Sequence, residues 1–134
     1  MNTIIDTILL DKLTELAMSS DRMRMNYDLR NSDEDTSQRM LNAIEPGSIV
    51  PVHRHRKTSE TVVVLRGSAV WEFYDEKRKA CVGSYNVSSK GPIYALNIPI
   101  GQWHSLHSLE SGTVIMEVKD GVYEPLKEID ILKL

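Results

Sequence analysis

Four side chains in the sequence could together bind one transition-metal ion. Two histidines alternate in His53-Arg54-His55, a carboxylate follows at Glu60, and His104 comes shortly after a Pro-Ile-Gly turn. Alternate residues of an extended strand point to the same face roughly 6–7 Å apart, so His53 and His55 can face the same ion. Three neutral imidazoles and one carboxylate suit Fe²⁺, Mn²⁺, Ni²⁺, Co²⁺ or Zn²⁺, and we expect one such divalent ion as the cofactor.

The alternative is that each histidine is an ordinary core or surface residue. A single histidine on a strand is more often such a residue than a metal ligand. The fourth histidine, His107, lies three residues after His104 and should therefore point to the opposite face of its strand. His107 and Tyr27 are the candidates for a catalytic acid or base. Packing is the alternative role for the tyrosine.

One helix is predicted near the N-terminus. Asp6 can cap it, and Leu9, Leu13 and Leu16 recur at the spacing of an amphipathic helix. The polar run 19–21 should end the helix. Residues 21–39 show no sustained period and are interpreted as a loop that could include one short strand.

From Leu41 onward the pattern changes to short strands separated by turn residues, at intervals of roughly ten residues. The expected strands cover residues 51–56, 60–66, 69–74, 81–87, 94–98, 103–109 and 113–119. Regularly spaced strands after a single helix favour a β-sandwich or a small barrel. The tail from Gly121 is expected to be extended or weakly helical.

Length and composition fit one globular domain over residues 1–134, with an arm at 1–45 and a barrel core at 46–119. The net charge of −3 gives no electrostatic reason to expect nucleic acid or an anionic membrane as a partner. Acidic residues interrupt every apolar run near the N-terminus, and a single cysteine, Cys81, fits a reducing compartment. We therefore expect a cytoplasmic protein. Sheet edges that need cover favour a homodimer.

Residues 47–108 resemble the two sequence motifs of the cupin superfamily. The first motif requires a glycine, two alternating histidines, a glutamate and a second glycine, and Gly47, His53, His55, Glu60 and Gly67 match it at every spacing. The second motif is matched from Pro99 to His104, but Gly91 lies seven rather than five residues before the proline, and Ser108 replaces an asparagine. The resemblance implies a mainly β antiparallel jelly-roll barrel with a metal near one mouth, bound by the two histidines and the glutamate of the first motif and by His104.

A closer resemblance covers nearly the whole chain. The segments from Arg22 to Arg56, from Glu60 to Gly67 and from Ile98 to Pro125 resemble the WbuC-type cupin-fold metalloproteins. These are short bacterial cupins often associated with surface-polysaccharide biosynthesis. The resemblance implies a sugar or sugar-nucleotide derivative as the ligand.

Polar residues before the first motif could contact such a ligand. Arg39, Asn26 and Asn42 are the candidates, and seven of the eight arginines fall between residues 22 and 66. Guanidinium groups bind phosphate and carboxylate groups, which favours an anionic sugar derivative; surface ion pairs are the alternative role for these arginines.

Three functions are compatible with this pattern. We favour a metal-dependent enzyme of the isomerase, epimerase or lyase type. An Fe-dependent dioxygenase is a second possibility, and a non-catalytic metal-dependent sugar-binding or regulatory cupin is the third. An acid or base beside the metal would distinguish an enzyme from a binding protein.

Overall fold

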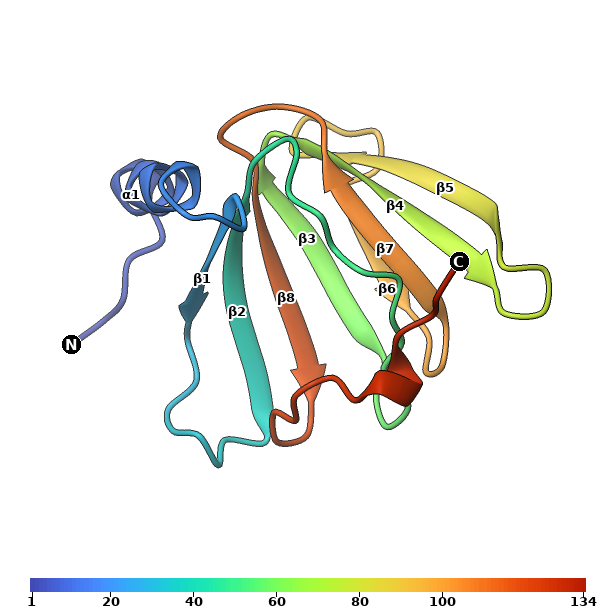
Figure 1. Ribbon diagram of the computed structural model, residues 1–134. Coiled ribbons are helices and arrows are strands. Elements are labelled where there is room, and N and C mark those ends of the chain that lie inside the picture. The colour runs from blue at the N-terminus through green and yellow to red at the C-terminus, as the bar shows by residue number, and fades with distance from the viewer.

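A computed structural model describes residues 1–134, and the chain is mainly β-strand with one α-helix near the N-terminus (Figure 1). In chain order the elements are α1 (Thr7–Met18), β1 (Arg24–Asp28), β2 (Ser37–Ile44), β3 (Glu60–Arg66), β4 (Ser68–Asp75), β5 (Ala80–Ser88), β6 (Ala95–Ile98), β7 (Trp103–Ser108), β8 (Val114–Asp120) and the short 3-10 helix η1 (Glu128–Asp130). No helix of the chain has both the length and the apolar character needed to span a membrane.

The strands form two antiparallel sheets that enclose one core. The larger sheet has the order β1-β2-β8-β3-β6, and the smaller has the order β5-β4-β7. Side chains from both sheets meet between them, including Val62 and Ile115 from the larger sheet and Trp71 and Leu106 from the smaller. The predicted jelly-roll barrel with a short N-terminal helix is confirmed.

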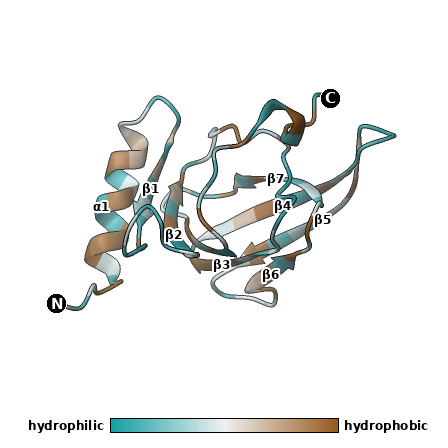
Figure 2. Cartoon of the chain, turned by 90° about the horizontal axis from the view of Figure 1, so that it is seen from below, coloured by the Kyte–Doolittle hydropathy of each residue, from teal (hydrophilic) through white to brown (hydrophobic).

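The predicted helix is also confirmed. Asp6 is its N-cap, and Oδ1 of Asp6 accepts a hydrogen bond of 3.0 Å from the backbone N–H of Leu9. Leu13 and Ala17 pack against side chains of β2 and β8 in a second apolar cluster. Figure 2 shows α1 beside β1 and β2 and outside the ring of strands. This helix therefore covers the outer face of the larger sheet.

Asp6→Ala should lower the free energy of unfolding by about 1 kcal/mol, because the first turn of α1 loses its side-chain cap. Urea denaturation followed by circular dichroism measures this effect. Asp21→Ala is the control, since Asp21 is exposed and its side chain makes no hydrogen bond or ion pair. Equal stability of the two variants would show that the cap contributes nothing measurable.

Two segments differ from the sequence-based expectation. The predicted loop at 21–39 contains the one short strand that the prediction allowed, β1, but its last residues belong to a second strand, β2, which begins at Ser37. The segment 51–56, which we predicted to be a strand, forms only isolated bridges at His53, to His104 on one side and to Ile131 on the other. Hydrogen bonds of 2.9 Å in both directions join the backbones of His53 and His104, the N–H of Gly101 donates to the carbonyl of His55 at 2.8 Å, and the C-terminal segment supplies further partners. A short irregular loop thus takes the place of a regular strand.

Gly67 joins β3 to β4 at a point where no side chain fits. Its φ is +81°, a left-handed conformation that favours glycine, and a Cβ at this position would collide with the backbone and side chain of Thr113. The close approach of residues 67 and 113 brings the β3–β4 connection against the start of β8.

Candidate metal site

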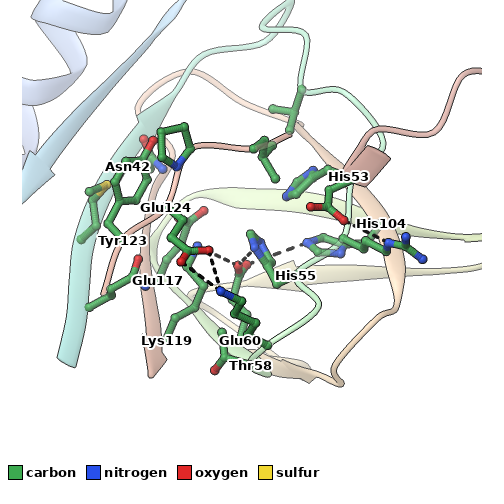
Figure 3. Close-up of a pocket in the computed structure, with 18 of the residues that line it drawn as sticks. Asn42, His53, His55, Thr58, Glu60, His104, Glu117, Lys119, Tyr123 and Glu124 are labelled. Carbon is green, nitrogen blue, oxygen red and sulfur yellow. Dashed lines mark hydrogen bonds and ion pairs between the residues drawn. The ribbon is translucent and has the colours of Figure 1, made fainter. Parts of the chain in front are cut away.

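Three histidines from distant parts of the sequence converge inside one mouth of the barrel (Figure 3). His53 and His55 come from the loop before β3, and His104 comes from the start of β7. One ring nitrogen from each of the three lies within 4.8 Å of the other two. The paired backbones of His53 and His104 hold two of these imidazoles side by side, with ring centroids 4.4 Å apart.

The hydrogen bonds of two histidines leave their inner nitrogens free to bind a cation. Nδ1–H of His53 donates to the carbonyl of Pro51 at 2.8 Å, and Nδ1–H of His104 donates to the carbonyl of Gln102 at 2.9 Å. A carbonyl can only accept, so Nδ1 carries the proton and Nε2 keeps its lone pair in the neutral ring. Burial lowers the pKa of His53 to about 4 and also lowers the pKa of His104. Both rings are therefore neutral near pH 7.

Glu60 adds a carboxylate to the cluster. It is the first residue of β3 and is 4% exposed, with Oε2 at 2.9 Å from Nε2 of His55 and at 3.2 Å from Nζ of Lys119. Burial acts to raise the pKa of Glu60, but the contact with His55 and the charge of Lys119 outweigh it and hold the pKa below its ordinary range. The Glu60 carboxylate is therefore ionised, and the ammonium group of Lys119 compensates its negative charge.

The four side chains fit a divalent transition metal. Nε2 of His55 and Nε2 of His104 are buried, and neither has a hydrogen-bond partner with suitable alignment. Buried polar atoms in proteins normally have a partner, and a cation at the meeting point of these atoms would provide one. Three imidazole nitrogens and one carboxylate oxygen form a donor set suited to several divalent ions, and it does not select one of them.

The cluster lies in a pocket of about 600 Å³ whose wall includes residues that the sequence analysis missed. Glu117 and Lys119 of β8 line it, as do Arg22 and Arg24 near the start of β1. Burial, followed by the nearby charge of Glu60, raises the pKa of Glu117 to about 7. Glu117 therefore carries a proton part of the time near neutral pH.

Among the predicted ligand-contacting residues, Asn26 and Asn42 line this pocket. They are paired across β1 and β2, so they lie on the same face of the sheet. The Asn42 amide contacts Glu117, and its buried Oδ1 has no hydrogen-bond partner. Asn42 therefore offers a free acceptor inside the pocket.

Three other candidates lie elsewhere, and strand parity explains each case. Arg39 is three residues before Asn42 on β2 and so points to the other face, where its guanidinium pairs with Asp35 at 3.2 Å. Tyr27 neighbours Asn26 and packs into the apolar cluster beneath α1. His107 is exposed, and its Nδ1 lies 3.1 Å from Oε1 of Glu72. None of the three contacts the histidine cluster.

The C-terminal segment completes one side of the pocket. Asp130 forms ion pairs with Arg54 at 3.2 Å and with Arg56 at 2.7 Å, so it fixes the loop that carries two of the histidines. Lys57 pairs with Glu124 at 3.0 Å, while Tyr123 and Glu124 line the pocket itself. The guanidinium of Arg54 also lies over the ring of Trp103, 4.5 Å from its centroid.

Comparison with solved structures gives the same fold at low sequence identity. CapF, the capsular polysaccharide assembling protein of Staphylococcus aureus, is 22% identical with a TM-score of 0.65, over 79% of this chain and 30% of that one. KdgF of Halomonas sp. is 13% identical with a TM-score of 0.58, over 73% and 80%. A variant of oxalate decarboxylase from Bacillus subtilis is 24% identical with a TM-score of 0.55, over 74% and 24%.

These structures are cupin-fold proteins, and the likeness shows the fold. The chain spans about 30% of the length of CapF. No curated protein matches the sequence. The family model that matches, over residues 5–82, is DUF6016, a domain of unknown function. This chain therefore belongs to the DUF6016 family, and its fold is that of a cupin.

Proposed function

We propose that this protein is a small metal-binding cupin that acts on a sugar or sugar-nucleotide derivative in surface-polysaccharide biosynthesis, as an isomerase, epimerase or lyase. His53, His55, Glu60 and His104 would hold one divalent transition metal. The observation that carries the proposal is the convergence of the three imidazoles beside an ionised glutamate, with the buried Nε2 of His104 lacking a hydrogen-bond partner in the protein.

The relatives support parts of this proposal. CapF is described as a capsular polysaccharide assembling protein, and the oxalate decarboxylase of Bacillus subtilis has Mn(II) centres. The sequence resemblance to WbuC-type cupins favours the same area of metabolism. Together these relatives favour a sugar derivative as the ligand and a divalent metal as the cofactor.

The pocket also contains a group suited to proton transfer, which favours an enzyme over a binding protein. A bound divalent ion would polarise a carbonyl group or bind adjacent oxygens of a sugar. Glu117, whose pKa is raised to about 7 mainly by burial, can both accept and donate a proton near neutral pH. Asn42 contacts Glu117 and holds this carboxyl group on the pocket wall.

The test is metal analysis of protein purified without a chelating resin. We expect about one divalent ion per chain in the wild type and loss of most of it in His53→Ala, because the remaining ligands cannot rebuild an equivalent site. His107→Ala is the matched control. Its ring pairs with Glu72 away from the cluster, so its metal content should equal that of the wild type.

A wild type that binds no divalent ion after dialysis against Mn²⁺, Fe²⁺ or Zn²⁺ would disprove the metal proposal. Equal loss in both variants would show that the ligand set is misassigned. The reaction class has its own readout: turnover of a nucleotide sugar with several divalent ions and without oxygen supports isomerase, epimerase or lyase chemistry. Strict dependence on both iron and oxygen would instead identify a dioxygenase.

A further inference from the structure

The arginines of this chain divide into two groups by their partners. Five of the eight form ion pairs with a carboxylate: Arg30, Arg39, Arg54, Arg56 and Arg66. The other three have no carboxylate within 4.0 Å, and two of these, Arg22 and Arg24, line the pocket that contains the histidine cluster. The third, Arg78, lies in the turn between β4 and β5, outside the pocket.

Arg24 is partly buried and uses little of its hydrogen-bonding capacity. Its Nη1–H donates to the carbonyl of Ile49 at 2.9 Å, and this is its only side-chain hydrogen bond. Burial lowers the pKa of Arg24, and the neighbouring charge of Arg22 acts in the same direction, whereas the nearby carboxyl group of Glu117 acts to raise it. A guanidinium has five N–H donors in a planar fork, so most of the donors of Arg24 remain free for an oxyanion.

The backbone that carries both arginines is fixed to the loop after β2. Oγ–H of Ser48 donates to the carbonyl of Arg22 at 2.7 Å, and the N–H of Glu45 donates to the carbonyl of Met23 at 2.9 Å. Both side chains therefore extend from an anchored section of the pocket wall. Such anchoring lowers the entropy lost when a ligand binds.

Most other cations of the pocket already have anionic partners. Lys119 pairs with Glu60, Lys57 pairs with Glu124, and Arg54 and Arg56 share Asp130. Lys127 has no partner but is an exposed side chain outside any strand. The unpaired positive charge on the strand wall is thus concentrated at residues 22 and 24.

We propose that Arg22 and Arg24 form a subsite for the phosphate or carboxylate group of a polyhydroxylated ligand. Asn42, on the same wall, accepts a hydrogen bond from a ligand hydroxyl through its buried and unpartnered Oδ1. This inference rests on the proposed function, because it assigns the anionic end of the sugar derivative whose other end faces the histidines. The subsite itself uses no metal ligand, so it also binds the anion in metal-free protein.

Calorimetric titration with glucose 1-phosphate, glucuronate and glucose tests the subsite in EDTA-treated protein. Wild type should bind at least one of the two anions more tightly than glucose, and the anion that binds identifies phosphate or carboxylate as the recognised group. Arg24→Gln should weaken that binding by about 10- to 100-fold, the effect of losing a charge-assisted hydrogen-bonding group. Arg78→Gln makes the same charge change outside the pocket and should leave binding unchanged.

Two further variants make the result independent of folding defects in Arg24→Gln. Arg22→Gln alters an exposed side chain and should weaken the binding of the same anion. Arg24→Lys should retain only part of the wild-type affinity, because a lysine lacks the planar fork of N–H donors. Equal affinity of wild type and both glutamine variants, or wild-type binding no tighter for the anions than for glucose, overturns the subsite. Metal content is measured in the same protein preparations before EDTA treatment. Normal metal with no anion preference rejects only the subsite, whereas absence of metal rejects only the proposed metal site.

Discussion

Lys119→Met should destabilise the metal-free protein by about 3 kcal/mol, the usual cost of leaving a buried charge without its partner. Nζ of Lys119 lies 3.2 Å from Oε2 of Glu60, and the two residues are paired across β8 and β3. Both side chains are largely buried, at 16% and 4% exposed. Removal of the ammonium group leaves the Glu60 carboxylate with only neutral or weakly basic neighbours.

A divalent metal should recover most of this loss, because the ion replaces the ammonium group as the compensating charge and binds only the folded state. Urea unfolding with EDTA and with saturating Mn²⁺ measures both conditions. Lys12→Met alters an exposed and unpaired lysine of α1 and is the control. It should change the free energy of unfolding little, both with EDTA and with Mn²⁺. A loss for Lys119→Met that is the same with and without metal would mean that Lys119 contributes packing rather than charge.

Glu117→Gln should stabilise the metal-free protein, and the gain should grow as pH rises. The pKa of Glu117 is raised from 4.5 to about 7 by burial and by Glu60. The folded protein therefore holds this proton more tightly than the unfolded chain does. That contribution is fully present below pH 4.5 and is lost as pH rises through 7. Glutamine cannot ionise, so the variant avoids the loss.

At about 1.4 kcal/mol per pKa unit, the stability difference between Glu117→Gln and wild type should increase by about 3 kcal/mol from pH 4.5 to pH 8. Thermal or urea unfolding at several pH values in EDTA measures it. Glu76→Gln, in the exposed turn after β4, is the control and should show no such trend. A difference that does not change with pH would show that folding does not raise the pKa of Glu117. It would then no longer support a proton-transfer role for this residue.

Local patterns in the sequence were sufficient for the elements that depend on neighbouring residues. The cap at Asp6, the leucine spacing of α1 and the runs of β-branched residues each predict an element that the structure contains. The spacing of His53, His55, Glu60 and His104 predicted that these residues lie close together, and they do, although the loop that carries the first two is not a regular strand.

Parity within a strand could have refined the list of ligand-contacting residues. Arg39 and Asn42 are an odd number of positions apart, so one strand cannot direct both into the barrel. Asn26 and Tyr27 are adjacent and must also diverge. The same rule gives a signal for two residues that were missed, since Glu117 and Lys119 share the parity of the core residue Ile115 on β8.

Other features could not be derived from local sequence. The pairing of β8 with both β2 and β3 joins segments that are far apart in the chain, and only this pairing brings Lys119 to Glu60. The loop at 51–56 depends on hydrogen bonds to β7 and to the C-terminal segment, and no local sequence pattern predicts this pairing. The lack of a carboxylate partner for Arg22 and Arg24 is known only from the structure, because the sequence does not show which carboxylates lie near which arginines.

The first cupin motif contains two kinds of residue: Gly67, which the fold itself requires, and residues that could bind a metal. Glycine is required at position 67 by the neighbouring Thr113 and by a left-handed backbone, whereas the candidate ligands His53 and His55 are required only if a metal binds. A related sequence that keeps Gly67 and Thr113 but has lost the histidines would keep the barrel without the ion. Sequence divergence in such a family can therefore remove the candidate metal site while the fold persists. Presence of the glycine alone is thus no guide to whether a relative has the histidine cluster.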